Sequence, residues 1–198
     1  MSLDIPADPG TPACAAARQV AAKYCSVALL NHCARSYIWA AAYGRREGVP
    51  YDPELLYVGA MLHDIGLVPE FDSHTVGFDD ASGHVAYVFS AGAGWDEARR
   101  DRLVDVVLSH MWDAVDVAVH PEGFLLERST SMDISGQYMD DFTAPFKAEV
   151  LHRFPREGIA GEFLFCFEDQ AKRKPASSPA RSLRNGIAGR ILGNMLDR

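Results

Sequence analysis

Residues 51–67 read YDPELLYVGAMLHDIGL, and this run sets the expectation for the rest of the chain. Asp52 suits an N-cap, and Pro53 suits the first helical position, where its missing N–H costs nothing. An apolar run follows and leads to His63 and Asp64. The run therefore predicts a buried helix that ends in two side chains able to bind a metal ion.

Helical patterns continue on both sides of this run. Residues 12–46 are rich in Ala and Leu and predict one or two helices, and Gly66 is expected to end the central helix. Residues 112–131 are mixed and are expected to be partly irregular. No run of alternating apolar residues predicts a strand, so the chain is expected to be all-α. Further helices are expected at about residues 79–90, 96–110, 158–174 and 183–196.

The expected organisation is one helical domain. Residues 1–11 contain prolines and a glycine and are expected to form a flexible lead-in. Residues 12–176 are expected to form the domain. Residues 177–198 are expected to form a polar linker followed by a short helix.

Composition excludes several classes of protein. The net charge of -8 and the pI near 5.3 argue against a nucleic-acid binder, which needs basic patches. No apolar run approaches the roughly 18 residues of a membrane helix, so no membrane contact is expected. The start shows no secretory pattern, and the four cysteines show neither disulfide nor zinc-ribbon spacing. We therefore expect a cytoplasmic protein with a small-molecule substrate, and a homo-oligomer stays open.

The pair His63-Asp64 is the first candidate for chemistry. Two adjacent polar side chains at the end of an apolar helix need a reason, and both can reach one ion where the backbone turns away. A neutral imidazole and a carboxylate suit zinc, iron or manganese. The dipeptide alone is a weak signal, because such pairs occur often by chance.

Three further polar residues, taken in their order along the chain, are candidates for the same site. His32 lies in an apolar helix, where a core histidine bonded to a carbonyl is the alternative. His110 lies on the apolar face of its helix and is either a ligand, a partner of a ligand or a substrate contact. Asp133 is either an oxygen ligand or the N-cap of a helix beginning at Ile134. The order His, His-Asp, His, Asp, with separations of 31, 47 and 23 residues, favours one shared site.

This order resembles the HD-domain superfamily, whose metal ligands follow the order H…HD…D, and within it the cyanamide hydratase-like proteins. The resemblance implies a helical bundle around one divalent ion, with ligands at His32, His63, Asp64 and Asp133. It favours zinc, with iron or manganese as alternatives. It also places His110 at a recurrent site position, and we expect Asp64 or His110 to relay a proton. The resemblance covers about residues 28 to 176 and rests on NHCARSYIWA, YDPELLYVGAMLHDIGL, GFDDASGHVA, LSHM, MDISG and FPREG followed by FLFCFEDQAKRKP.

Four residues are expected to contact the substrate. Arg35 lies three residues after His32 and can bind a phosphate oxygen. Phe78 and Trp112 are candidate walls of a small pocket. Asp79 stands where the hydratase-like pattern usually has glutamate, so its carboxylate is one methylene shorter.

Three functions are compatible with these residues. The first is hydration of a small nitrile-like molecule such as cyanamide by a metal-activated water. Few Lys and Arg lie near the motifs, and a small neutral substrate needs no cationic clamp. The second is hydrolysis of phosphomonoesters or nucleotides, with Arg35 on the phosphate. The third is a metal-stabilised binding or regulatory module without turnover.

Overall fold

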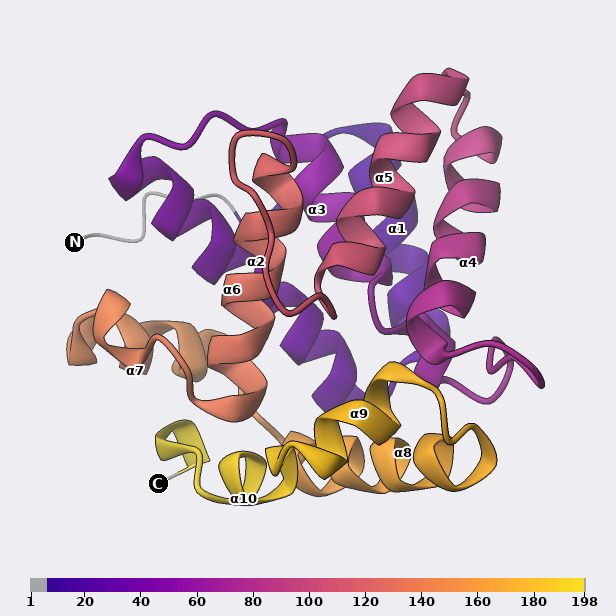
Figure 1. The fold of residues 1–198 in the computed structure, drawn as a ribbon. Helices are drawn as coiled ribbons and strands as arrows, with labels where there is room; N and C mark the ends of the chain where they lie inside the picture. Colours follow the sequence, from indigo (N-terminus) through magenta and orange to yellow (C-terminus); the bar gives the residue numbers. More distant parts are fainter. Residues whose placement is uncertain (1–6, 198) are drawn as a thin grey trace.

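The computed structural model describes residues 7–197, and within this range the chain contains ten α-helices, three short 3-10 helices and no strand (Figure 1). The expectation of an all-α fold is confirmed. Of the predicted lead-in, residues 1–6 lie outside the described range. The elements are α1 (Pro12–Tyr24), α2 (Val27–Glu47), α3 (Pro53–Leu62), η1 (Ile65–Leu67), α4 (Phe78–Gly92), α5 (Glu97–Ser109), α6 (Pro121–Ser135), η2 (Met139–Asp141), α7 (Ala144–Arg153), α8 (Ile159–Arg173), α9 (Ser178–Arg184), α10 (Ile187–Leu192) and η3 (Met195–Asp197).

The caps explain where the first three helices begin and end. Ser26 divides the predicted N-terminal helical stretch in two, because its hydroxyl accepts the Leu29 N–H at 3.0 Å and starts α2. Gly48 ends α2 in the left-handed conformation, with φ of 68°. Asp52 starts α3 as predicted, with its carboxylate accepting the Leu55 N–H at 3.1 Å.

Helix α6 occupies a region that was expected to be partly irregular. It begins with Pro121 at its first position and ends at Gly136, which is left-handed with φ of 70°. Its inner face mixes apolar residues such as Leu126 with the buried polar residues Ser129 and Asp133. This mixture hides the helical period of apolar residues, which is why the pattern did not predict the helix.

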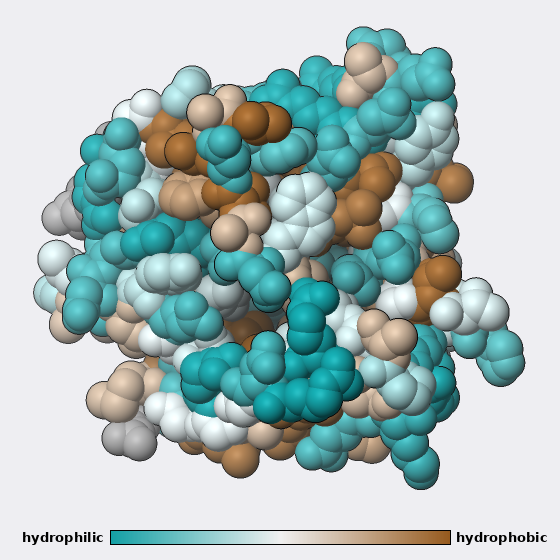
Figure 2. Space-filling model, in the orientation of Figure 1, coloured by the Kyte–Doolittle hydropathy of each residue, from teal (hydrophilic) through white to brown (hydrophobic). Residues whose placement is uncertain are grey.

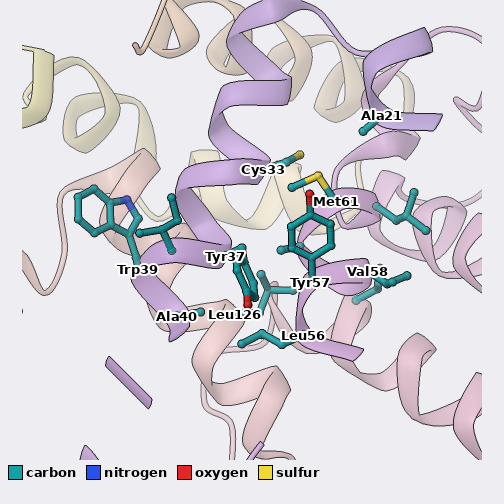
Figure 3. Close-up of a cluster of buried hydrophobic side chains, with 14 of the residues drawn as sticks. Ala21, Cys33, Tyr37, Trp39, Ala40, Leu56, Tyr57, Val58, Met61 and Leu126 are labelled. Atoms are coloured by element: carbon teal, nitrogen blue, oxygen red, sulfur yellow. The ribbon is translucent and has the colours of Figure 1, made fainter. Parts of the chain in front are cut away.

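The centre of the molecule is formed by α2, α3 and α6. Every residue of α3 from Leu55 to Leu62 is buried. Figure 3 shows Tyr37 of α2 and Tyr57 of α3 in this cluster, and their ring centroids are 4.9 Å apart. Because α3 is buried along its length, the residues that follow it emerge inside the protein.

The C-terminal segment packs on the domain as helices. Ser177 caps α9 with its hydroxyl, so a helix occupies residues that were expected to be a linker. Helices α9 and α10 run along α8 (Figure 1), and α10 also contacts α6. The Asn194 side chain donates to the carbonyls of Asp133 and Ile134 at 2.9 and 3.1 Å. The last residues are therefore tied to the end of α6.

The surface carries mixed polarity. The face in Figure 2 is mostly hydrophilic, with apolar residues in small separate patches. Among the described helices, none combines the length and the apolar character that a membrane span requires.

Candidate metal centre

Three of the predicted ligands meet in the interior. His63 and Asp64 follow the last residue of α3, and His32 projects from α2. His32 Nε2 lies 3.1 Å from His63 Nε2 and 3.3 Å from Asp64 Oδ2, and His63 Nε2 lies 3.1 Å from the same oxygen. These separations suit three donors placed about 2.0–2.2 Å from one shared ion. His32, His63 and Asp64 can therefore hold a metal ion together.

The imidazoles of the site share one orientation. His32 Nδ1 donates to Asp133 at 2.7 Å, and His63 Nδ1 donates at 2.8 Å to the carbonyl three residues earlier. His110 Nδ1 donates to its own third preceding carbonyl. A ring that donates from Nδ1 in its neutral form carries its lone pair on Nε2. All three rings therefore turn an Nε2 lone pair toward Asp64.

Unpartnered buried atoms support a cation at this position. Both carboxylate oxygens of Asp64 are buried without a hydrogen-bond partner, and so is His110 Nε2, which lies 3.6 Å from Asp64 Oδ1. A buried carboxylate without compensation is costly, and a bound cation compensates it directly. Two imidazoles and a carboxylate form a donor set that suits zinc, iron or manganese. The residues present therefore fit a divalent metal.

The electrostatics favour the ligand forms of two of these groups. Burial opposes ionisation of Asp64, but His63, His110 and His32 outweigh it and hold the pKa of the carboxyl well below its usual range. Burial, helped by the charges of His110 and His32, lowers the pKa of His63. For His32, burial lowers the pKa, but the nearby carboxylates of Asp133 and Asp64 outweigh it and raise the pKa. A metal ion therefore competes with a proton at His32.

The carboxylate of Asp133, which was predicted to be a metal ligand, accepts hydrogen bonds from three side chains of α2. Its oxygens accept two hydrogen bonds from the Arg35 guanidinium at 2.8 Å, one from Trp39 Nε1 at 3.2 Å and one from His32 Nδ1. The carboxylate therefore lies behind the His32 ring, on the side away from the other donors. In this geometry Asp133 orients the His32 ring, and its role as a fourth ligand stays a prediction. Its other predicted role, as an N-cap, is wrong, because the residue lies inside the last turn of α6.

The guanidinium of Arg35 binds other groups of the protein. Its side chain is fully buried, and the guanidinium binds Asp133 and the carbonyls of Phe154 and Pro155. These bonds use four of the five N–H donors of the guanidinium, so a single N–H is left over for any other partner. These bonds do not favour the predicted substrate contact at Arg35, which stays a prediction.

The three other predicted contacts also lie off the centre. Phe78 is buried behind His110, with ring centroids 5.7 Å apart, so it supports that ring. Trp112 is 41% exposed and packs edge-on against His120. Asp79 lines a different cavity, beside residues 173–178. All three were predicted from their nearness to the motifs along the chain, and none of them is among the residues that line the cavity at the metal centre.

A small cavity of about 60 Å³ opens onto the candidate centre. Helices α6, α8 and α10 supply most of its wall, and these contributions were missed. The hydroxyl-rich run around Asp133 was the available signal for α6, whereas nothing in the sequence marked Ile187 of α10. No Lys or Arg occurs among its described lining residues. These are His32, His63, Asp64, His110, Met111, Thr130, Ser131, Ile134, Ser135, Gln137, Phe163, Phe167 and Ile187.

Comparison with known proteins agrees with this centre. The family model described as HD domain matches residues 29–128, which include His32, His63-Asp64 and His110. Two proteins of Saccharomyces cerevisiae named cyanamide hydratase, DDI2 and DDI3, are each 25% identical to this chain over 163 residues. The alignments cover 80% of this chain and 72% of each relative. The predicted resemblance is confirmed, and the relatives support a metal-dependent enzyme. The chain belongs to the HD-domain family.

Proposed function

We propose that this protein is a metal-dependent hydratase that adds water to a small nitrile-type molecule such as cyanamide, giving an amide or urea. The observation that carries the proposal is the cavity of about 60 Å³ beside His32, His63 and Asp64, which has no Lys or Arg among its described lining residues. Pockets for larger ligands measure roughly 300–1,000 Å³, so this cavity favours a substrate of few atoms. The two yeast relatives, which are named cyanamide hydratases, support the same substrate class.

His32, His63 and Asp64 would hold the ion, for which we propose zinc, with iron or manganese as alternatives. A divalent ion bound there would lower the pKa of its bound water toward about 7 and polarise the group under attack. The protein's own contribution is orientation. Asp133 and the backbone fix the rings of His32 and His63 by accepting their Nδ1 protons.

His110 is the proposed proton carrier. Adding water to a nitrile forms a C–O bond at carbon, and the proton that leaves the water must reach the nitrogen. His110 lines the cavity, and its Nε2 is buried without a hydrogen-bond partner. In the neutral ring this atom can accept a proton and return it. Asp64, 3.6 Å from Nε2, stabilises the imidazolium that forms in between.

The hydroxyls of α6 add a preference for a ligand that donates hydrogen bonds. Thr130 and Ser135 donate to backbone carbonyls of the helix, and Ser131 donates to the carboxylate of Glu127. Their hydroxyl hydrogens are therefore used, and what they offer in the cavity is an oxygen lone pair. Lone pairs suit the amino group of cyanamide and repel the oxygens of a phosphate. Because Arg35 is also occupied, phosphomonoester hydrolysis is the weaker alternative.

A paired assay tests the proposal. Protein loaded separately with zinc, iron(II) or manganese is given cyanamide, with urea as the measured product, and a panel of phosphomonoesters and nucleotides, with phosphate as the product. We expect urea formation that scales with metal content and stops when a chelator removes the ion. Phosphate release without urea would contradict the proposal and favour the phosphohydrolase. Absence of both products with metal bound would also contradict it.

A further inference from the structure

A second and larger cavity, of about 490 Å³, adjoins the candidate metal centre. Its walls come from the same elements that carry the metal-competent residues. Leu29 lies three residues before His32 on α2, and Leu67 lies three residues after Asp64. Helix α8 supplies the opposite wall. The two cavities therefore lie on two sides of the same short stretch of protein.

One residue borders both spaces. Among the described residues, Phe163 of α8 is the one that lines both cavities. Its side chain is 5% exposed, and its ring centroid lies 5.9 Å from that of His32 and 4.6 Å from that of Phe167. The ring thus stands beside a metal-competent imidazole and is held there by a second aromatic side chain.

We infer that Phe163 is a specificity-determining residue, whose ring closes the cavity of about 60 Å³ against the neighbouring cavity of about 490 Å³. For the substrate class, this inference rests on the proposed function. With the ring in place, only a molecule of few atoms fits beside His32 and His110. With the ring removed, a nitrile or cyanamide that carries an alkyl or aryl substituent can place that substituent in the larger space.

The wall of the larger cavity defines which substituents it would accept. Most of it is apolar, and besides Phe163 two aromatic residues, Tyr24 and Phe165, line it. Of its carboxylates, Asp72 and Asp169 are paired with Arg173. Glu162 accepts only the Ser26 hydroxyl, at 2.7 and 2.8 Å, and no described cation lies within ion-pair distance of it. The space therefore favours neutral or cationic substituents over anionic ones.

The test compares Phe163→Ala and Phe163→Leu with the control Phe165→Ala. Phe165 is two residues away on the same helix and is 72% exposed. It lines the larger cavity but not the cavity at the metal centre. Each protein is loaded with cobalt(II) and titrated with imidazole and with 4-phenylimidazole, and binding is read from the visible absorption of cobalt. This readout needs no turnover. Circular dichroism and metal content identify variants that fail to fold. If Phe163→Ala fails to fold, Phe163→Leu still allows the comparison.

We expect the wild type and Phe165→Ala to bind imidazole and to discriminate against its phenyl derivative. Phe163→Ala should bind the phenyl derivative roughly tenfold or more tightly than the wild type does, because burying the phenyl ring is worth at least 1.4 kcal/mol. The affinity of Phe163→Leu for the phenyl derivative should lie between those of the wild type and Phe163→Ala. Unchanged discrimination in both folded variants would overturn the inference, as would equal binding of the two ligands by the wild type.

A turnover experiment separates this inference from the proposed function. Cyanamide and N-benzylcyanamide are compared by kcat/KM in the same proteins. If the protein is a hydratase and Phe163 is the partition, Phe163→Ala raises the ratio for the larger substrate by about tenfold or more. If no protein hydrates cyanamide while the cobalt titrations still shift, the proposed function fails and the partition stands. Turnover of both substrates at an unchanged ratio would count against Phe163.

Discussion

At the scale of single residues, the centre is organised around Asp64. Three imidazoles, from α2, from the end of α3 and from the end of α5, turn their Nε2 atoms toward this one carboxylate, and no described hydrogen bond satisfies its oxygens. In a metal-free protein this arrangement leaves a buried anion compensated only by nearby rings. Removing the charge of Asp64 should therefore affect metal binding before it affects the fold.

Asp64→Asn tests this expectation with a side chain of nearly the same size. We expect zinc affinity to fall by more than the 10–100-fold typical of a lost outer partner, because a direct donor is lost. Metal content after dialysis and competition with a chromophoric chelator measure it. Asp79→Asn is the matched control, since that carboxylate lies outside the metal cavity. Full zinc occupancy in Asp64→Asn would remove Asp64 from the ligand set.

His110→Ala is the contrasting variant at the same centre. Its Nε2 lies near Asp64 but is not part of the three-donor group, so the metal should remain while kcat for urea formation falls by about 10²–10⁴-fold. Metal loss in His110→Ala, at wild-type thermal stability, would instead make His110 a direct ligand.

At the scale of elements, the turn from α3 into η1 decides where His63 and Asp64 point. Gly66 lies in η1, and a Cβ at this position would stand 2.2 Å from the Phe78 carbonyl oxygen and 3.0 Å from the Ser82 backbone nitrogen. Both neighbours are backbone atoms of α4 and cannot rotate away. The glycine is therefore required for the close approach of α4 to the metal-binding turn.

Gly66→Ala should destabilise the protein by about 1–3 kcal/mol, because the added methyl group forces apart two packed backbones. For a chain of this size that loss lowers Tm by several degrees, at roughly 2–4 °C per kcal/mol. Differential scanning calorimetry of the apo-protein measures it without interference from bound metal.

Gly161→Ala in α8 is the control for this substitution. Nothing lies within 4 Å of a Cβ at that position, so alanine should be neutral or should raise Tm through its higher helix propensity. Equal Tm values for the two alanine variants would show that η1 has room to adjust and that the close approach is not required.

The same elements show what the sequence could predict. The start of α3 followed from Asp52 and Pro53, and its burial followed from its apolar run, because caps and hydrophobic patterns are local properties. Gly66 was correctly marked as special but for another reason. It was expected to end α3, whereas the helix ends at Leu62 and the glycine accommodates α4. A contact between distant segments leaves no local pattern.

The partners of the site residues were hidden for the same reason. Arg35 and Asp133 lie 98 residues apart in sequence and bind each other, so reading either one alone gave it a role toward a ligand. The order His, His-Asp, His predicted residues that do converge. The side chains that shape the cavity around them come from α6, α8 and α10, and only the folded chain brings these together.

At the scale of the whole molecule, the end of the chain closes the site. The family model matches residues 29–128, yet Ile187 of α10 lines the metal cavity and Asn194 binds the end of α6. Arg156 strengthens the same junction, since it pairs with Asp197 and donates to the Asp133 carbonyl. The substrate cavity therefore depends on a segment outside the matched region.

Asn194→Ala should loosen this closure. The side chain is 2% exposed and donates to two carbonyls at the end of α6. Its loss leaves the Ile134 carbonyl without this donor, whereas Arg156 still donates to the Asp133 carbonyl, and we expect a cost of about 1–3 kcal/mol. Because α10 is short and gains its stability from packing, its amide protons should exchange faster, as measured by hydrogen exchange with mass spectrometry. Asn185→Ala, an exposed asparagine before α10, is the matched control and should match the wild type. If α10 and the C-terminal half of α6 keep wild-type protection in Asn194→Ala, the closure rests on the apolar contacts of Ile187 and Ile191 instead of the asparagine.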